Sequence, residues 1–153
     1  MEIILVARSI GARSANATLS LDSHAALVFN FGSTAAPDYW IAQGGPRNGI
    51  LAGALGPIGA RWQSAFAETT GMIWDQPGVG MCAPVRELKR FSLAGVDRQR
   101  VQALVEGLNR SAQRYDYNNG PNSNTYVRRI LDQLGLQFQP NTASVVLRGW
   151  NYR

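Results

Sequence analysis

Two residues of this chain have side chains and settings suited to acyl-transfer chemistry. Ser123 lies in the stretch GPNSNTYVRRIL, and His24 is the one histidine among the 153 residues. Ser123 is expected in the first turn of a helix, where unpaired backbone N–H groups and the positive end of the helix dipole stabilise a developing oxyanion. A serine hydroxyl needs a base to remove its proton, and histidine provides one near neutral pH. The two residues together predict a nucleophile and its general base.

Both residues also have ordinary structural explanations. Serine and asparagine are preferred at helix N-caps, so Ser123 equally suits a cap without any chemistry. A single histidine at the start of a strand is common as a half-buried side chain. The distance between the Ser123 hydroxyl and the nearer His24 ring nitrogen separates the two interpretations, because proton transfer requires hydrogen-bonding range.

A catalytic histidine needs a third group that orients its ring. His24 and Gln43 are expected on the two strands of one antiparallel hairpin, whose turn is centred near Ser33 and Thr34. Residues whose numbers sum to roughly 67 then face each other, which puts Gln43 almost opposite His24. Gln43 is neutral and would fix the tautomer of the ring without adding charge. Asp38 is an ionised alternative, but it belongs to the far end of the same hairpin.

The stretch NSNTY, from Asn122 to Tyr126, resembles the Asn-Cys-Asn-x-Phe motif of the permuted papain-fold peptidases called PPPDE. Serine stands here in place of cysteine, and tyrosine in place of phenylalanine. An early histidine followed by a late nucleophile is also similar to the relatives of lecithin retinol acyltransferase. In those proteins a second polar group lies on the strand after the histidine, and Gln43 would occupy that role here. The resemblance covers the order of elements over most of the chain, but specific residues match only around His24 and within 122–127.

The resemblance implies a circularly permuted papain-like α+β fold and a hydrolase of amide or ester bonds. Ser123 would attack the acyl carbon, His24 would take and return the proton, and Gln43 would hold the ring. The oxyanion would lie at the Ser123 backbone N–H, with help from Asn122 or Asn124. In bacteria, domains resembling this fold cleave peptidoglycan amides, peptide bonds or lipid esters, and some are toxins delivered by secretion machines. A peptide, peptidoglycan or lipid substrate is therefore expected, together with an immunity or delivery protein as partner.

Serine at the cysteine position leaves three explanations open, because a thiol ionises near neutral pH whereas a serine hydroxyl depends on its base. The chain is a natural serine hydrolase, a degenerate pseudoenzyme, or a cysteine enzyme with an introduced serine. The rival class is a non-catalytic binding module or a structural component of a phage or secretion particle. The one cysteine, Cys82, does not begin a helix and is interpreted as a buried structural thiol.

Composition restricts the classes of partner, cofactor and cellular location that are expected. The formal net charge is +5, and 14 of the 15 basic residues are arginine. Runs of basic residues and clustered aromatics are lacking, which disfavours nucleic acid as the partner. One cysteine and one histidine cannot form a structural zinc site, so no metal or other cofactor is expected. The sequence has no run of about 18 apolar residues and no signal-peptide pattern, so we expect a cytoplasmic protein or one exported by a dedicated secretion system.

The elements that must position these residues are predicted from periodicity and turn signals. They form one α+β domain over residues 1–153, with an antiparallel sheet and at least two packed helices. A helix capped by Asp97 carries apolar residues at i, i+3, i+4 and i+7, and a second helix ends at Gly135. The predicted strands span 2–8, 24–31, 38–45, 85–93 and 143–150, with a glycine-rich loop over 44–59, a short helix over 60–69 and a turn-rich stretch over 71–80.

Overall fold

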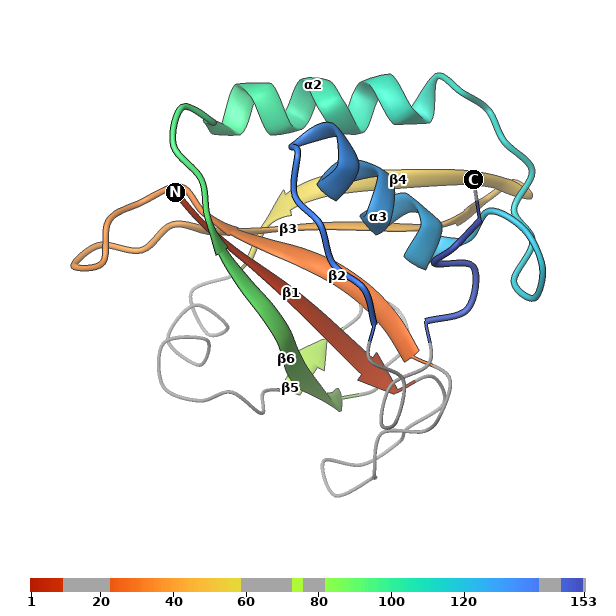
Figure 1. Cartoon of the computed structure of the whole chain (residues 1–153), viewed down its shortest axis with the longest axis horizontal. Helices are drawn as coiled ribbons and strands as arrows, with labels where there is room; N and C mark the ends of the chain where they lie inside the picture. The colour runs from red at the N-terminus through yellow and green to blue at the C-terminus, as the bar shows by residue number, and fades with distance from the viewer. Residues whose placement is uncertain (10–22, 59–72, 76–81, 141–146, 153) are drawn as a thin grey trace.

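The computed structural model describes residues 1–9, 23–58, 73–75, 82–140 and 147–152. Within these residues the fold is α+β, as predicted, with an antiparallel sheet of strand order β4-β3-β2-β1-β6-β5 and two helices on one of its faces (Figure 1). The elements are β1 (Glu2–Ser9), β2 (Ser23–Asn30), β3 (Tyr39–Arg47), β4 (Ile50–Pro57), β5 (Ile73–Asp75), β6 (Cys82–Ser92), α2 (Arg98–Asn109) and α3 (Ser123–Gln133).

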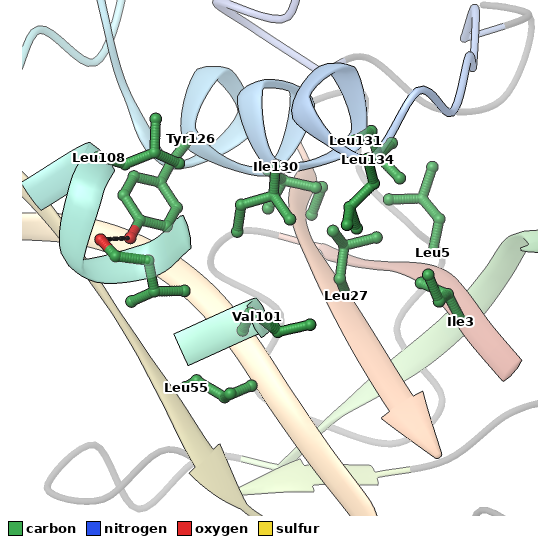
Figure 2. Close-up of a cluster of buried hydrophobic side chains, with 14 of the residues drawn as sticks. Ile3, Leu5, Leu27, Leu55, Val101, Leu108, Tyr126, Ile130, Leu131 and Leu134 are labelled. Atoms are coloured by element: carbon green, nitrogen blue, oxygen red, sulfur yellow. Dashed lines mark hydrogen bonds between the residues drawn. The ribbon is translucent and has the colours of Figure 1, made fainter. Parts of the chain in front are cut away.

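Both faces of the central strands are apolar, and the two faces build separate clusters. In β2, the residues Ala25, Leu27 and Phe29 pack with the helices, and Figure 2 shows part of this cluster beneath α3. Ala26 and Val28 point to the other face, where they join a second cluster. Successive side chains of a strand alternate between faces, so a strand covered on both sides shows an unbroken apolar run such as AALVF.

The predicted loop over 44–59 is wrong for residues 44–57, which complete β3 and form β4. Residue 59 lies outside the described residues. The two strands are joined at Asn48 and Gly49, whose φ angles of 52° and 75° are the left-handed values that a tight hairpin turn requires. Two glycines inside the hairpin, Gly44 and Gly53, make room for packing. Gly44 pairs with Gly53, and a Cβ at either position would lie 2.6 or 2.3 Å from the Tyr126 side chain. The missing side chains therefore make room for a buried aromatic ring from α3.

The two predicted helices are confirmed. The Asp97 carboxylate accepts a hydrogen bond from the Arg100 N–H at 2.8 Å and caps α2. After α3, Gly135 adopts a φ of 72°, and the Leu136 N–H returns to the Leu131 carbonyl at 2.9 Å, which closes the helix. Among the described residues, neither helix combines the length and apolar character needed to span a bilayer.

Two further predictions fall partly or wholly on residues outside the described ranges. The short helix predicted over 60–69 lies outside them, as does most of the turn-rich stretch, although Ile73–Asp75 forms a short strand there. The last predicted strand, over 143–150, is wrong for residues 147–150, which form a turn. That turn is held by α3, because the carbonyls of residues 148, 149 and 150 accept hydrogen bonds from Asn124, Thr125 and Arg128.

Candidate active site

Asn122 is the N-cap of α3, and Ser123 is the first helical residue. The Asn122 side chain accepts hydrogen bonds from the backbone N–H groups of Asn124 and Thr125, and the Thr125 hydroxyl accepts one from the Asn122 N–H. This reciprocal pair is a capping box. The interpretation of Ser123 as the helix cap is therefore wrong, and its side chain is buried at 6% exposure without that role.

Asn124 joins the start of α3 to the start of β2. Its Oδ1 accepts a hydrogen bond from the Ala25 N–H at 2.8 Å, and its Nδ2 donates to the Ser23 carbonyl at 3.0 Å. These two backbone groups flank His24, and a neighbouring strand would ordinarily pair with them. The register of β2 with β3 runs from the Asn30–Tyr39 pair to the Leu27–Ala42 pair, so Asn124 takes the place of a strand partner at this end. The helix start thus lies at the backbone edge of the strand that carries His24.

The structure brings Gln43 to His24. The His24 Nε2 and Gln43 Oε1 atoms are 3.3 Å apart, and the His24 side chain is buried at 9% exposure. Because an amide oxygen only accepts hydrogen bonds, this contact suits the tautomer of His24 that carries its proton on Nε2. The contact predicted between Gln43 and the His24 ring is thus present.

The register behind that reasoning was wrong by two residues. Leu27 pairs with Ala42, so the paired numbers sum to 69. Gln43 consequently lies diagonally across from His24, at a separation that a long side chain can bridge. Asp38 is not the orienting group. Its backbone N–H bonds to the Asn30 side chain at the far end of β2, and its carboxylate accepts from the Trp40 indole N–H at 3.0 Å.

Sequence reasoning missed Tyr115, which lies beside the candidate nucleophile. Burial raises the pKa of the Tyr115 hydroxyl above its ordinary value, and a hydrogen bond with the Ser123 side chain opposes that rise. The phenol is therefore protonated near neutral pH and sits next to the Ser123 hydroxyl. The signal in the sequence is that two tyrosines, Tyr115 and Tyr117, lie a few residues before the NSN motif.

The expected oxyanion role of the two asparagine side chains conflicts with their contacts. Asn124 donates its two amide hydrogens to the carbonyls of Ser23 and Arg148, so none is left for a substrate. The Asn122 side chain caps the helix and donates to the Tyr117 carbonyl at 3.1 Å. Both asparagines position the helix start. The Ser123 backbone N–H, which the cap does not engage, is the donor that suits an oxyanion.

His24 and Ser123 lie on different sides of β2. Ala25 and Leu27 face α3, so alternation puts His24 on the opposite face together with Ala26. Ser123 comes from the helix side, where Asn124 meets the edge of the strand. His24 and Ser123 are therefore both buried at the start of β2, but they approach it from opposite faces of the sheet.

The comparisons with known proteins found no matching family model, no matching curated protein and no matching solved structure. Within the part of the chain that the structure describes, no three His, Cys, Asp or Glu side chains are grouped to hold a metal ion. Cys82 begins β6, and the burial of its thiol stays a prediction because its side chain is outside the described part.

Proposed function

We propose that the chain is a hydrolase of amide or ester bonds in which Ser123 is the nucleophile and His24 its base. The observation that carries the proposal is the contact between His24 Nε2 and Gln43 Oε1, at the strand end that Asn124 binds beside Ser123. An oriented histidine and a hydroxyl at a helix N-terminus are the parts that this chemistry requires.

The proposed reaction uses the tautomer of His24 that the contact with Gln43 Oε1 suits. With the proton on Nε2, the Nδ1 atom of His24 takes the Ser123 proton while the Ser123 oxygen attacks the acyl carbon. The oxyanion accepts hydrogen bonds from the Ser123 N–H and the Tyr115 hydroxyl. The imidazolium then protonates the leaving amine or alcohol, and an acyl-enzyme forms. Water attacks this ester, His24 accepts a proton from the water, and the acid is released as Ser123 regains its proton.

The resemblance to the permuted papain-like fold supports the same proposal, since it independently pairs an early histidine with a late nucleophile in NSNTY. On this proposal the substrate is a peptide, a peptidoglycan fragment or a lipid ester. A bacterial effector exported by a dedicated secretion system, with an immunity or delivery protein as partner, is the biological setting that we propose for it.

Fluorophosphonate labelling followed by mass spectrometry tests the nucleophile. We expect one adduct, on Ser123, with no adduct in Ser123→Ala and a strongly slowed one in His24→Ala. Ser92→Ala, which removes an exposed serine at the end of β6, is the matched control and should label as wild type. An adduct on a different residue, or equal labelling of His24→Ala, would show that these two residues do not work together.

A second candidate is a pseudoenzyme that binds without turnover. The burial of Ser123 and His24 and the placement of His24 on the sheet face opposite α3 favour it. Ser123→Cys separates the two. In the hydrolase, His24 stabilises the thiolate, so the thiol reacts rapidly with iodoacetamide at pH 6, and the rapid reaction is lost on adding His24→Ala. A thiol with ordinary reactivity, together with no hydrolysis of peptides, peptidoglycan fragments or phospholipids by any variant, establishes the pseudoenzyme.

A further inference from the structure

Exposed tyrosines gather beside the candidate site. Tyr117 and Tyr152 are the exposed large hydrophobic side chains among the described residues, at 38% and 40% exposure. They come from the loop between α2 and α3 and from the C-terminal turn, which lie on the same side of the molecule (Figure 1). Both line one surface depression of about 780 Å³, and Tyr115 lines it too. We call this hollow, lined by Tyr115, Tyr117 and Tyr152, the tyrosine depression.

Backbone hydrogen bonds hold the three tyrosines of the tyrosine depression in place. The Tyr115 N–H donates to the Gly49 carbonyl at 2.8 Å, and the Tyr152 N–H donates to the Gly149 carbonyl at 3.1 Å. The Tyr117 carbonyl accepts from the Asn122 side chain at 3.1 Å. Rings carried on a held backbone lose little conformational freedom when a ligand binds, which favours affinity.

The lining selects the class of ligand. Among the described residues that line the depression, Pro121 is the one aliphatic side chain, which is a poor surface for an acyl chain. The remaining side chains are tyrosine rings and the planar polar groups of residues such as Arg114 and Asn119. The faces of aromatic rings are electron-rich and pack against the polarised C–H groups of a sugar ring. Planar amide and guanidinium groups donate to sugar hydroxyl and acetamido oxygens.

We infer that the tyrosine depression is a binding subsite for an oligosaccharide, with Tyr117 and Tyr152 stacking on its sugar rings. Tyr115 lines this subsite and also bonds to Ser123, so the bound saccharide lies next to the reacting atoms. Among the substrates of the proposed hydrolase, a glycan-bearing one is thereby favoured. This assignment of substrate rests on the proposed function, whereas saccharide binding itself does not.

The test is a calorimetric titration of the full-length Ser123→Ala protein with chitotetraose, and in parallel with cellotetraose. We expect saturable binding to at least one of the two. Tyr117→Ala and Tyr152→Ala should each raise the Kd about fivefold or more, the loss of roughly one ring-face interaction. Tyr117→Phe keeps the ring face and should bind within about twofold of the parent. Gln99→Ala changes a different depression, near Trp40, and serves as the control.

Three outcomes overturn the inference: no saturable binding to either saccharide, binding that the tyrosine variants leave unchanged, or tighter binding to a single-stranded RNA octamer than to both saccharides. Because the titration uses Ser123→Ala, it does not depend on turnover. Saccharide binding without fluorophosphonate labelling of the wild-type protein would retain the subsite and remove the hydrolase. Labelling of Ser123 without saccharide binding would do the reverse.

Discussion

At the scale of single residues, the helix start divides two roles that one serine was expected to combine. Asn122 satisfies the first-turn N–H groups, and Ser123 follows it with a hydroxyl that bonds to Tyr115. Ser123 is buried although it does not cap the helix. Its hydroxyl bonds to Tyr115, which lies in the candidate site.

Replacing the two residues separately should show this division in the free energy of unfolding. Asn122→Ala is expected to cost about 0.5–2 kcal/mol, the usual loss for a polar N-cap. Ser123→Ala should cost clearly less, because the cap stays intact. Urea unfolding followed by circular dichroism measures both, with Asn119→Ala as an exposed control. A larger loss for Ser123→Ala than for Asn122→Ala would contradict the assignment of the cap.

At the scale of elements, the Asn124 side chain makes the hydrogen bonds that a neighbouring strand would make at the start of β2. It pairs with the Ala25 N–H and the Ser23 carbonyl across a sequence separation of about a hundred residues, and so fixes α3 against the strand that carries His24. Such a bond is buried, and losing it leaves backbone groups without a partner.

Asn124→Ala should therefore destabilise the protein by about 1–3 kcal/mol, the cost of unsatisfied buried polar groups. The change should also be local. Native-state hydrogen exchange of the Ala25 amide is expected to accelerate more than that of Leu27, which lies within the paired part of β2. Equal acceleration at both amides would mean that Asn124 supports only global stability and does not hold this strand end.

The hairpin of β3 and β4 offers a matched pair of glycines. A Cβ at Gly53 would lie 2.3 Å from the Tyr126 ring, whereas one at Gly56 meets no atom within 4 Å. Gly53→Ala should cost about 1–3 kcal/mol from overpacking, and Gly56→Ala should change stability by much less. Thermal unfolding of the two variants measures the difference. Similar losses would indicate that backbone entropy, and not the ring, explains the glycine.

The same hairpin explains which elements the sequence could predict. Local periodicity predicts α2 and α3, because one buried face of a helix repeats at a fixed spacing. The early strands are predicted from their branched and aromatic residues, bounded by turn signals. Glycine density over 44–59 predicts a loop, because the reason for the missing side chains at Gly44 and Gly53 is the ring of Tyr126, far along the chain. The turn signal was nevertheless present in Asn48-Gly49.

The candidate site, like the fold, could be predicted only in part from the sequence. The hairpin arithmetic led to Gln43, because a short loop limits which residues can meet. The roles of Tyr115 and Asn124 depend on contacts between distant segments, and no local pattern encodes those contacts. The cap at Asn122 was a local feature, but serine and asparagine are nearly equivalent as caps, so the sequence did not distinguish the two neighbours.

At the scale of the whole molecule, the two helices and the sheet meet at a buried phenol. Tyr126 begins on α3, packs on Gly44 and Gly53 of the hairpin, and donates to the Val105 carbonyl of α2 at 3.1 Å (Figure 2). Its hydroxyl also contacts the Asn109 side chain, which bonds in turn to Gly53 within β4, the edge strand of the sheet. One side chain thus joins both helices to the edge of the sheet.

This arrangement predicts how stability responds to alkaline pH. Burial raises the pKa of Tyr126 well above its ordinary value of 10.0, and burial also raises the pKa values of Tyr39 and Tyr115. Below pH 10 the tyrosines are protonated in both states, and their contribution to stability is complete. Above it the unfolded chain loses protons that the folded chain keeps, so the free energy of unfolding falls, by up to about 1.4 kcal/mol per pH unit for each such tyrosine.

Tyr126→Phe isolates the contribution of the Tyr126 hydroxyl to stability and to its dependence on pH. At pH 7 the variant should be less stable by about 0.5–1.5 kcal/mol, because the hydroxyl donates a buried hydrogen bond. Between pH 10 and pH 11.5 its stability should decline less steeply than that of the wild type, since one titrating group has been removed. Urea unfolding at a series of pH values measures both slopes. Parallel slopes would mean that the Tyr126 hydroxyl ionises in the folded protein as readily as in the unfolded chain, and that its burial does not keep it protonated.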